Sequence, residues 1–134
     1  MADTVTSQTI QDGQRVAVLK FTNESDGTGE SSVKKVDVSA LSSNNEGKAC
    51  TSVSIARIHW FCRGMGVDVE FDATTNVLAV TLAPDSSGDE YFDQFSGIPN
   101  NAGSGVTGDI DFTTVGHSSG DAYSIILVLN KNYE

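Results

Sequence analysis

The amino-acid sequence predicts an all-β protein: a single-domain antiparallel β-sandwich or jelly roll of about eight strands with long loops. Apolar and polar residues alternate with a period of two along most of the chain, whereas helical periodicity is scarce. Candidate strands recur about every 8–14 residues and are separated by segments rich in Gly, Asp, Asn and Ser. This spacing is typical of sandwiches and barrels. The 134 residues suit one domain, 1–134, and no linker or internal repeat divides them.

The first candidate strands are amphipathic or polar. Residues 4–10 are polar and predict an edge strand, followed by a turn at Asp12-Gly13. Residues 15–22 alternate, so that one face carries Ala17, Leu19 and Phe21. A Gly- and Ser-rich loop is expected at 23–32, a short strand at 33–38 and a further loop at 39–47.

Two segments are apolar on much of both faces and are expected in the middle of a sheet. In 52–62 the alternation puts Val53, Ile55, Arg57, His59 and Phe61 on one face, and Ser54, Ala56, Ile58, Trp60 and Cys62 on the other. The last segment, 122–131, is expected to be the second central strand.

The clearest hairpin is predicted at 67–72 and 77–82, with Val67, Val69 and Phe71 facing inward and three carboxylates outward. Loops are expected at 84–89 and 97–108, with a short strand or irregular segment at 91–95 between them. Residues 109–114 alternate and should turn Ile110 and Phe112 inward.

The charge narrows the range of partners. Eight Lys and Arg stand against 18 Asp and Glu, a net charge of −10, and no basic cluster exceeds Lys34-Lys35. Such a surface repels phosphates and anionic lipids, so neither nucleic acid nor a membrane is expected as a partner. The sequence shows no signal peptide, and its longest apolar run, 125–129, is far too short for a membrane helix. Assembly in a cytosol is therefore expected.

No residue pattern indicates catalysis, so no enzyme and no cofactor are expected. His59 and His117 are the only histidines, and their surroundings match no nucleophile motif. Cys50 and Cys62 lie at opposite ends of one predicted strand, too far apart for a disulfide, and suggest free buried thiols. The acidic loops 24–30 and 85–90 lack the spacing of a helix–loop–helix calcium site. No metal site is predicted.

The candidate interface with a partner is an aromatic and apolar cluster: Tyr91, Phe92, Phe95, Ile98 and Pro99. Large aromatic side chains act as anchors in protein interfaces, but they also fill cores. The alternative is that these residues cap one end of the sandwich.

Several runs resemble small virion proteins of tailed bacteriophages, especially marine and cyanobacterial phages. The resemblance spans most of the chain and rests on the start, 1–10, and on 69–75, 95–100, 105–114 and 123–131. It implies a non-enzymatic structural protein, similar to the capsid decoration or cement proteins that bind the outer shell and clamp neighbouring capsid subunits. The expected partner is then the major capsid protein, the expected location is the outer capsid surface after assembly in the host bacterial cytoplasm, and a homo-oligomer is expected.

Two other functions remain open at this point. One is a tail, neck or fibre component of the same kind of virus. The other is a carbohydrate-binding β-sandwich module, for which Trp60 and three tyrosines are available, although Trp60 lies in a predicted central strand.

Overall fold

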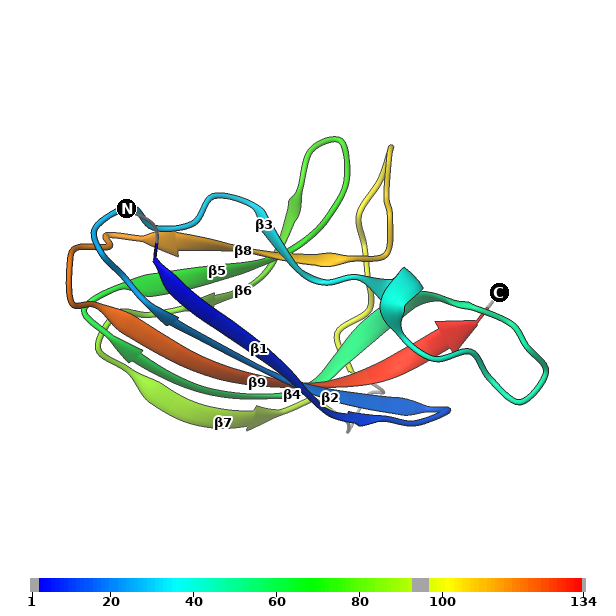
Figure 1. The fold of residues 1–134 in the computed structure, drawn as a ribbon. Coiled ribbons are helices and arrows are strands. Elements are labelled where there is room, and N and C mark those ends of the chain that lie inside the picture. The colour runs from blue at the N-terminus through cyan, green and yellow to red at the C-terminus, as the bar shows by residue number, and fades with distance from the viewer. Residues whose placement is uncertain (1–2, 93–96, 134) are drawn as a thin grey trace.

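The structure, a computed structural model, describes residues 3–92 and 97–133 and is a β-sandwich, which confirms the predicted fold class (Figure 1). The strands of the described residues form two antiparallel sheets, and one turn of 3-10 helix, η1 (Val38–Ala40), follows the third strand. Nine strands are present among these residues: β1 (Thr4–Asp12), β2 (Val16–Glu24), β3 (Val33–Val36), β4 (Cys50–Arg63), β5 (Gly66–Phe71), β6 (Val77–Leu82), β7 (Ser87–Tyr91), β8 (Ile110–Val115) and β9 (Ala122–Tyr133).

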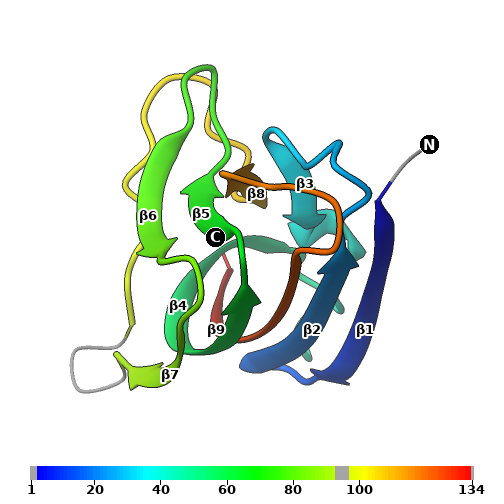
Figure 2. The same cartoon turned by 90° about the vertical axis from the view of Figure 1, so that its left-hand side faces the viewer.

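The five-stranded sheet has the order β1-β2-β9-β4-β7 (Figure 2). β9 and β4 are inner strands, as their two-sided apolar patterns predict, and so is β2. β1 is an edge strand whose residues are almost all exposed. β2 turns Ala17, Leu19 and Phe21 inward, and their exposed fractions do not exceed 7%. The alternation predicted for 15–22 is therefore confirmed.

The four-stranded sheet has the order β3-β8-β5-β6. β5 and β6 form the predicted hairpin, and β5 buries Val67, Val69 and Phe71. Ile110 and Phe112 of β8 are fully buried between the sheets. Phe112 packs edge-to-face against rings of the opposite sheet, with centroids 5.4 Å from Phe21 and 5.7 Å from Tyr123. These contacts join the two layers.

A β-bulge in β4 corrects the faces predicted for 52–62. The register with β9 shifts between Ile55 and Arg57, so one extra residue, Ala56, is accommodated. The shift reverses the phase of the alternation, and both Ile55 and Ile58 point into the core with no exposed surface. Strict alternation fails here because a bulged strand can bury apolar residues from both of its sequence phases.

A strand, β7, replaces the second half of the loop predicted at 84–89. Its Gly, Asp and Ser residues are typical of turns, but it pairs with the outer edge of β4 from Arg57↔Tyr91 to Phe61↔Ser87. Gly88 fits there because it lies against the Trp60 ring, and a Cβ at this position would come within 2.6 Å of Cη2. Pairing with a long neighbouring strand therefore outweighs local turn preference.

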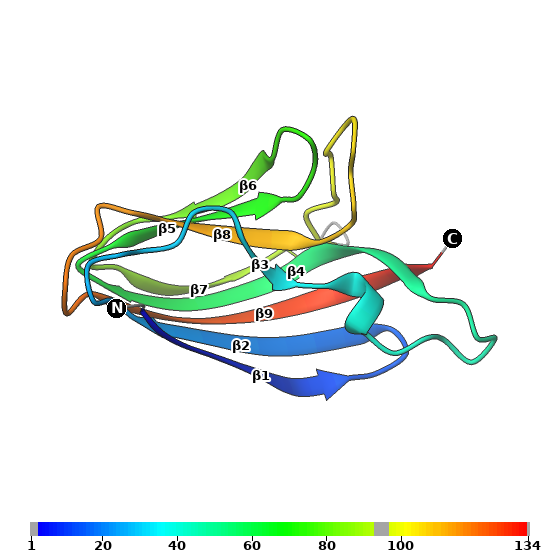
Figure 3. The ribbon, with the colours of Figure 1, turned by 45° about the horizontal axis from the view of Figure 1, so that its top comes forward.

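At one end of the sandwich, the β5–β6 loop and the loop that precedes β8 lie side by side (Figure 3). Backbone hydrogen bonds join them, from Thr74 N to Ser104 O at 3.1 Å and from Asp72 N to Asp109 O at 3.0 Å. The predicted loop 97–108 is thus held against its neighbour.

Candidate functional site

The outer face of the five-stranded sheet carries a row of side chains across all its strands. Figure 1 shows no described segment covering this face, which lies on the side away from the four-stranded sheet. The strand registers define two neighbouring rows, each with one residue from every strand. The first row contains Gln11, Val18, Val128, Arg57 and Tyr91, and the second contains Gln8, Lys20, Ile126, His59 and Asp89. We call this surface the outer face.

A shallow, mainly apolar groove of about 430 Å³ lies in the middle of the outer face. It is lined by Ile10, Val18, Arg57, His59, Ile126 and Val128. Ile10 is 52% exposed, and Phe61, in the third row of the same face, is 57% exposed. A sheet face in contact with water normally carries polar side chains. The apolar side chains of this groove are removed from water only when another molecule covers them.

None of the residues that line the groove belongs to the interface cluster predicted from the sequence. The signal was present in 122–131, whose outward positions hold Ile126 and Val128. Apolar residues on both faces predicted a central strand, which is confirmed. In a two-layer sandwich, however, even a central strand has one face that no second sheet covers. In β9 that uncovered face is apolar as well as the buried one.

The polar side of the groove is organised by Arg57. Its guanidinium donates two hydrogen bonds to the Asp89 carboxylate, at 2.8 and 2.6 Å, and lies 4.4 Å from the centroid of the Tyr91 ring. The hydrogen bonds from Arg57 lower the pKa of Asp89. His59 Nδ1 is 3.9 Å from the same carboxylate. This arrangement fixes a flat guanidinium and an aromatic ring side by side at the surface.

The outer face also differs from the rest of the chain in charge. Lys20, Arg57 and Arg63 project from it, three of the eight Lys and Arg. Of the 18 Asp and Glu, its rows contain Glu24 and Asp89. An acidic protein has therefore kept one sheet face close to neutral, which lowers the electrostatic cost of covering it.

The predicted interface cluster is divided by the structure. Tyr91 is 53% exposed and belongs to the outer face. Phe92 and Ile98 pack against the core, and their backbones bond to β4, Phe92 N to Ala56 O at 2.7 Å and Ile98 N to Ile55 O at 2.8 Å. Pro99 is exposed beside them, and Phe95 lies outside the described residues. Phe92 and Ile98 thus lie partly buried along β4.

The outer surface of the four-stranded sheet is acidic and contains one unusual carboxyl group. Asp111 is 3% exposed; its Oδ2 accepts a hydrogen bond from Asn76 at 3.0 Å, and its Oδ1 has no hydrogen-bond partner. Burial is the main cause that raises the pKa of Asp111, to about 6, and the neighbouring Asp72 carboxyl also raises it. The groups around it are occupied, since Asp72 accepts from Thr107 at 2.7 Å and Glu70 accepts from Thr113 at 3.0 Å.

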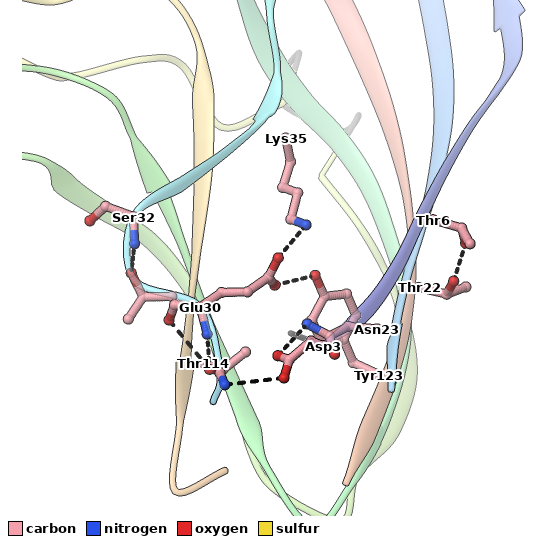
Figure 4. A network of polar contacts seen from close by, with 11 residues as sticks. Asp3, Thr6, Thr22, Asn23, Glu30, Ser32, Lys35, Thr114 and Tyr123 are labelled. Carbon is pink, nitrogen blue, oxygen red and sulfur yellow. Dashed lines mark hydrogen bonds and ion pairs between the residues drawn. The ribbon is translucent and has the colours of Figure 1, made fainter. Parts of the chain in front are cut away.

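The acidic loop 24–30 forms hydrogen bonds and an ion pair with other parts of the chain. Figure 4 shows Glu30 between Lys35 and Tyr123, forming an ion pair with the first and accepting a 2.6 Å hydrogen bond from the second. The Asp3 carboxylate accepts hydrogen bonds from the Asp26 and Gly29 amides. The second acidic loop, 85–90, is similarly engaged through Asp85, which accepts from Gly64 N at 2.8 Å. Neither loop presents a set of free carboxylates.

The remaining reactive side chains do not form a chemical site. Cys50 and Cys62 are free thiols that are buried at opposite ends of β4. His117 Nδ1 is 3.1 Å from the Thr114 hydroxyl, and His59 is exposed on the outer face. In residues 3–92 and 97–133, no three His, Cys, Asp or Glu side chains are grouped to hold a metal ion.

Comparisons with known proteins add no identification. No helix in the described part of the chain has the length and apolar character needed to cross a membrane. The sequence matches no protein-family model, and a search of curated proteins finds no match to it.

Proposed function

We propose that this chain is a non-enzymatic protein that binds a larger protein assembly through the outer face of its five-stranded sheet. The observation that carries the proposal is the apolar groove, flanked by Phe61 and Tyr91, on a face that is nearly neutral in a chain of net charge −10. Exposed aromatic side chains and an arginine stacked on a ring are the residue types that dominate interface energies.

The size of the face suits a protein partner. Strands in a sheet are about 4.8 Å apart and residues along a strand about 3.4 Å apart. The five strands have 5 to 14 residues each and 49 in all, so the face covers about 800 Å², close to the roughly 800 Å² that each partner contributes to a standard interface. A small ligand would use only the groove.

The assembly that we propose as the partner is the shell of a tailed bacteriophage. The support is the resemblance of runs such as 105–114 and 123–131 to small virion proteins. In this proposal the chain is a capsid decoration protein on the outer capsid surface, where it stabilises contacts between subunits of the major capsid protein. A role in the tail, neck or fibre would use the same binding chemistry at another position of the virion.

Binding to shells that lack the protein tests this proposal. The purified chain is expected to co-sediment with such shells, and Phe61→Glu is expected to weaken that binding at least tenfold, because a buried charge replaces an aromatic anchor. Val115→Glu is the matched control: Val115 is 48% exposed on the outer surface of the four-stranded sheet, and its variant should bind normally. Failure of the wild-type chain to bind, or equal loss in both variants, contradicts the proposal.

A carbohydrate-binding module is a second candidate, favoured by the exposed rings of Phe61 and Tyr91 on one sheet face. Trp60 does not offer such a platform, because it packs against the core and its Nε1 donates to Ser86 Oγ at 3.0 Å. A glycan array decides between the two. Binding of a glycan that Tyr91→Ala abolishes would favour the module, and an array without signal would remove it.

A further inference from the structure

We propose that β1 pairs edge to edge with β1 of a second copy, so that two five-stranded sheets join into one continuous ten-stranded sheet. β1 stands at the end of its sheet and pairs only with β2 among the described strands. Figures 2 and 3 show nothing beyond it on its outer side. Because the backbone of an edge strand offers unpaired N–H and C=O groups, this edge can accept another strand.

The side chains of β1 lack the features that normally block such pairing. Natural edge strands are protected by charges, prolines or short length. β1 has nine residues, and from Thr4 to Gln11 it contains no charged residue and no proline. Its composition of Thr, Val, Ile and Gln favours extended structure, and Val5 is 42% exposed.

The two carboxylates that flank this segment already have partners within the chain. Asp3 accepts hydrogen bonds from the Asp26 amide at 3.1 Å and the Asn23 side chain at 3.2 Å. Asp12 forms an ion pair with Lys131, whose side chain is fully buried. In a protein of net charge −10, self-association requires a contact surface that carries little unbalanced charge, and the β1 edge meets that requirement.

The other three edges are less suitable. β3 carries Lys34-Lys35, and β7 carries Asp89-Glu90. β6 is uncharged, but the register shift with β5 falls in its middle, at Ala79, and leaves no more than three regular residues on either side. The shift in β1 lies at Ile10, near its end, so that the six residues Thr4–Thr9 remain regular. The uninterrupted neutral edge is therefore β1.

The symmetry of the pair has a structural consequence. Two identical strands that pair antiparallel are related by a two-fold axis perpendicular to the sheet, which keeps the same face of both sheets on the same side. The pairing would therefore place two copies of the outer face next to each other. The dimer itself is a property of the purified chain and does not depend on the proposed shell binding.

Sedimentation equilibrium of the purified chain tests the proposal. The expected result is a concentration-dependent dimer of twice 14.1 kDa. The double variant Val5→Lys/Gln8→Lys places like charges along the joined edge and should be monomeric at concentrations where the wild type is dimeric. The matched control, Leu78→Lys/Thr81→Lys on the β6 edge, should remain dimeric, and circular dichroism checks that both variants are folded.

Hydrogen exchange supplies a second readout. Amides within Thr4–Thr9 that point away from β2 should exchange more slowly as the protein concentration rises, and this protection should vanish in Val5→Lys/Gln8→Lys. A wild-type monomer at about 0.5 mM overturns the proposal, since edge pairing at lower affinity would have little weight in solution. Loss of the dimer in the β6 variant, but not in the β1 variant, overturns it as well.

Discussion

The ion pair between Lys35 and Glu30 offers the sharpest test of what holds the two sheets together. Their side chains are 5% and 6% exposed, so both charges lie in the interior. Glu30 also accepts the Tyr123 hydroxyl at 2.6 Å, and its amide donates to the Thr114 hydroxyl at 2.8 Å. β3 and β9 therefore meet at the Glu30 carboxylate, and β8 holds the backbone of the same residue.

Lys35→Met removes the cation and leaves Glu30 with one charge-assisted partner. Met is similar in length and flexible, so packing should change little. Breaking a buried pair by removing one partner costs about 3–5 kcal/mol, because the remaining charge stays buried without compensation. A domain of this size has a stability of roughly 5–15 kcal/mol, so the predicted loss is a large share of the total.

Urea denaturation followed by Trp60 fluorescence at pH 7 measures the loss. Lys20→Met is the control, since Lys20 lies half-exposed on the outer face, and its variant should change the free energy of unfolding by less than about 1 kcal/mol. The double variant Lys35→Met/Glu30→Gln removes the stranded charge and should recover most of the loss. A cost below about 1 kcal/mol for Lys35→Met, or no recovery in the double variant, would refute the reasoning.

Two further predictions follow from buried titratable groups. The pKa of Asp111 is raised from 3.8 to about 6, so between these pH values the folded state binds more protons than the unfolded state and stability should fall as pH rises, by at most about 3 kcal/mol. Asp111→Asn can keep the hydrogen bond from Asn76 and should remove this pH dependence; an unchanged slope in denaturation midpoints between pH 4 and 6 would argue against the assignment. Burial raises the pKa of both thiols, that of Cys62 to about 11, so neither Cys50 nor Cys62 should react with a thiol reagent at pH 8 until the protein unfolds. Rapid labelling of the native protein, followed by mass spectrometry, would contradict this.

The sequence was sufficient for the architecture because binary patterning reports burial directly. The alternation in 67–72 predicts the inward Val67 and Phe71, and the two-sided apolar segments predict the inner strands. The errors have local causes. A bulge at Ala56 reversed the phase of β4, and no composition rule locates a bulge of this kind. β7 was missed because its Ser, Gly and Asp residues have turn preferences that only its pairing with β4 outweighs.

The candidate site was harder to predict, because its residues come from five strands. Ile10, Val18 and Ile126 lie far apart in sequence and meet only through the order β1-β2-β9-β4-β7. Strand order depends on the whole fold, and no single segment encodes it. A sequence pattern can group only residues that are close along the chain, and the predicted interface cluster therefore lies within 91–99. In the structure Phe92 and Ile98 pack against the core, whereas Tyr91 lies on the outer face.

Cryo-electron microscopy of the phage particle that is proposed to carry this chain tests the central proposal most directly. The account predicts icosahedral copies of the domain on the outer shell, with the outer face of the five-stranded sheet, including Phe61 and Ile126, against capsid subunits. Density for the domain that is confined to the tail would instead support a role in the tail, neck or fibre. Absence from the particle, or a domain that contacts the shell through the acidic four-stranded sheet, would contradict the account.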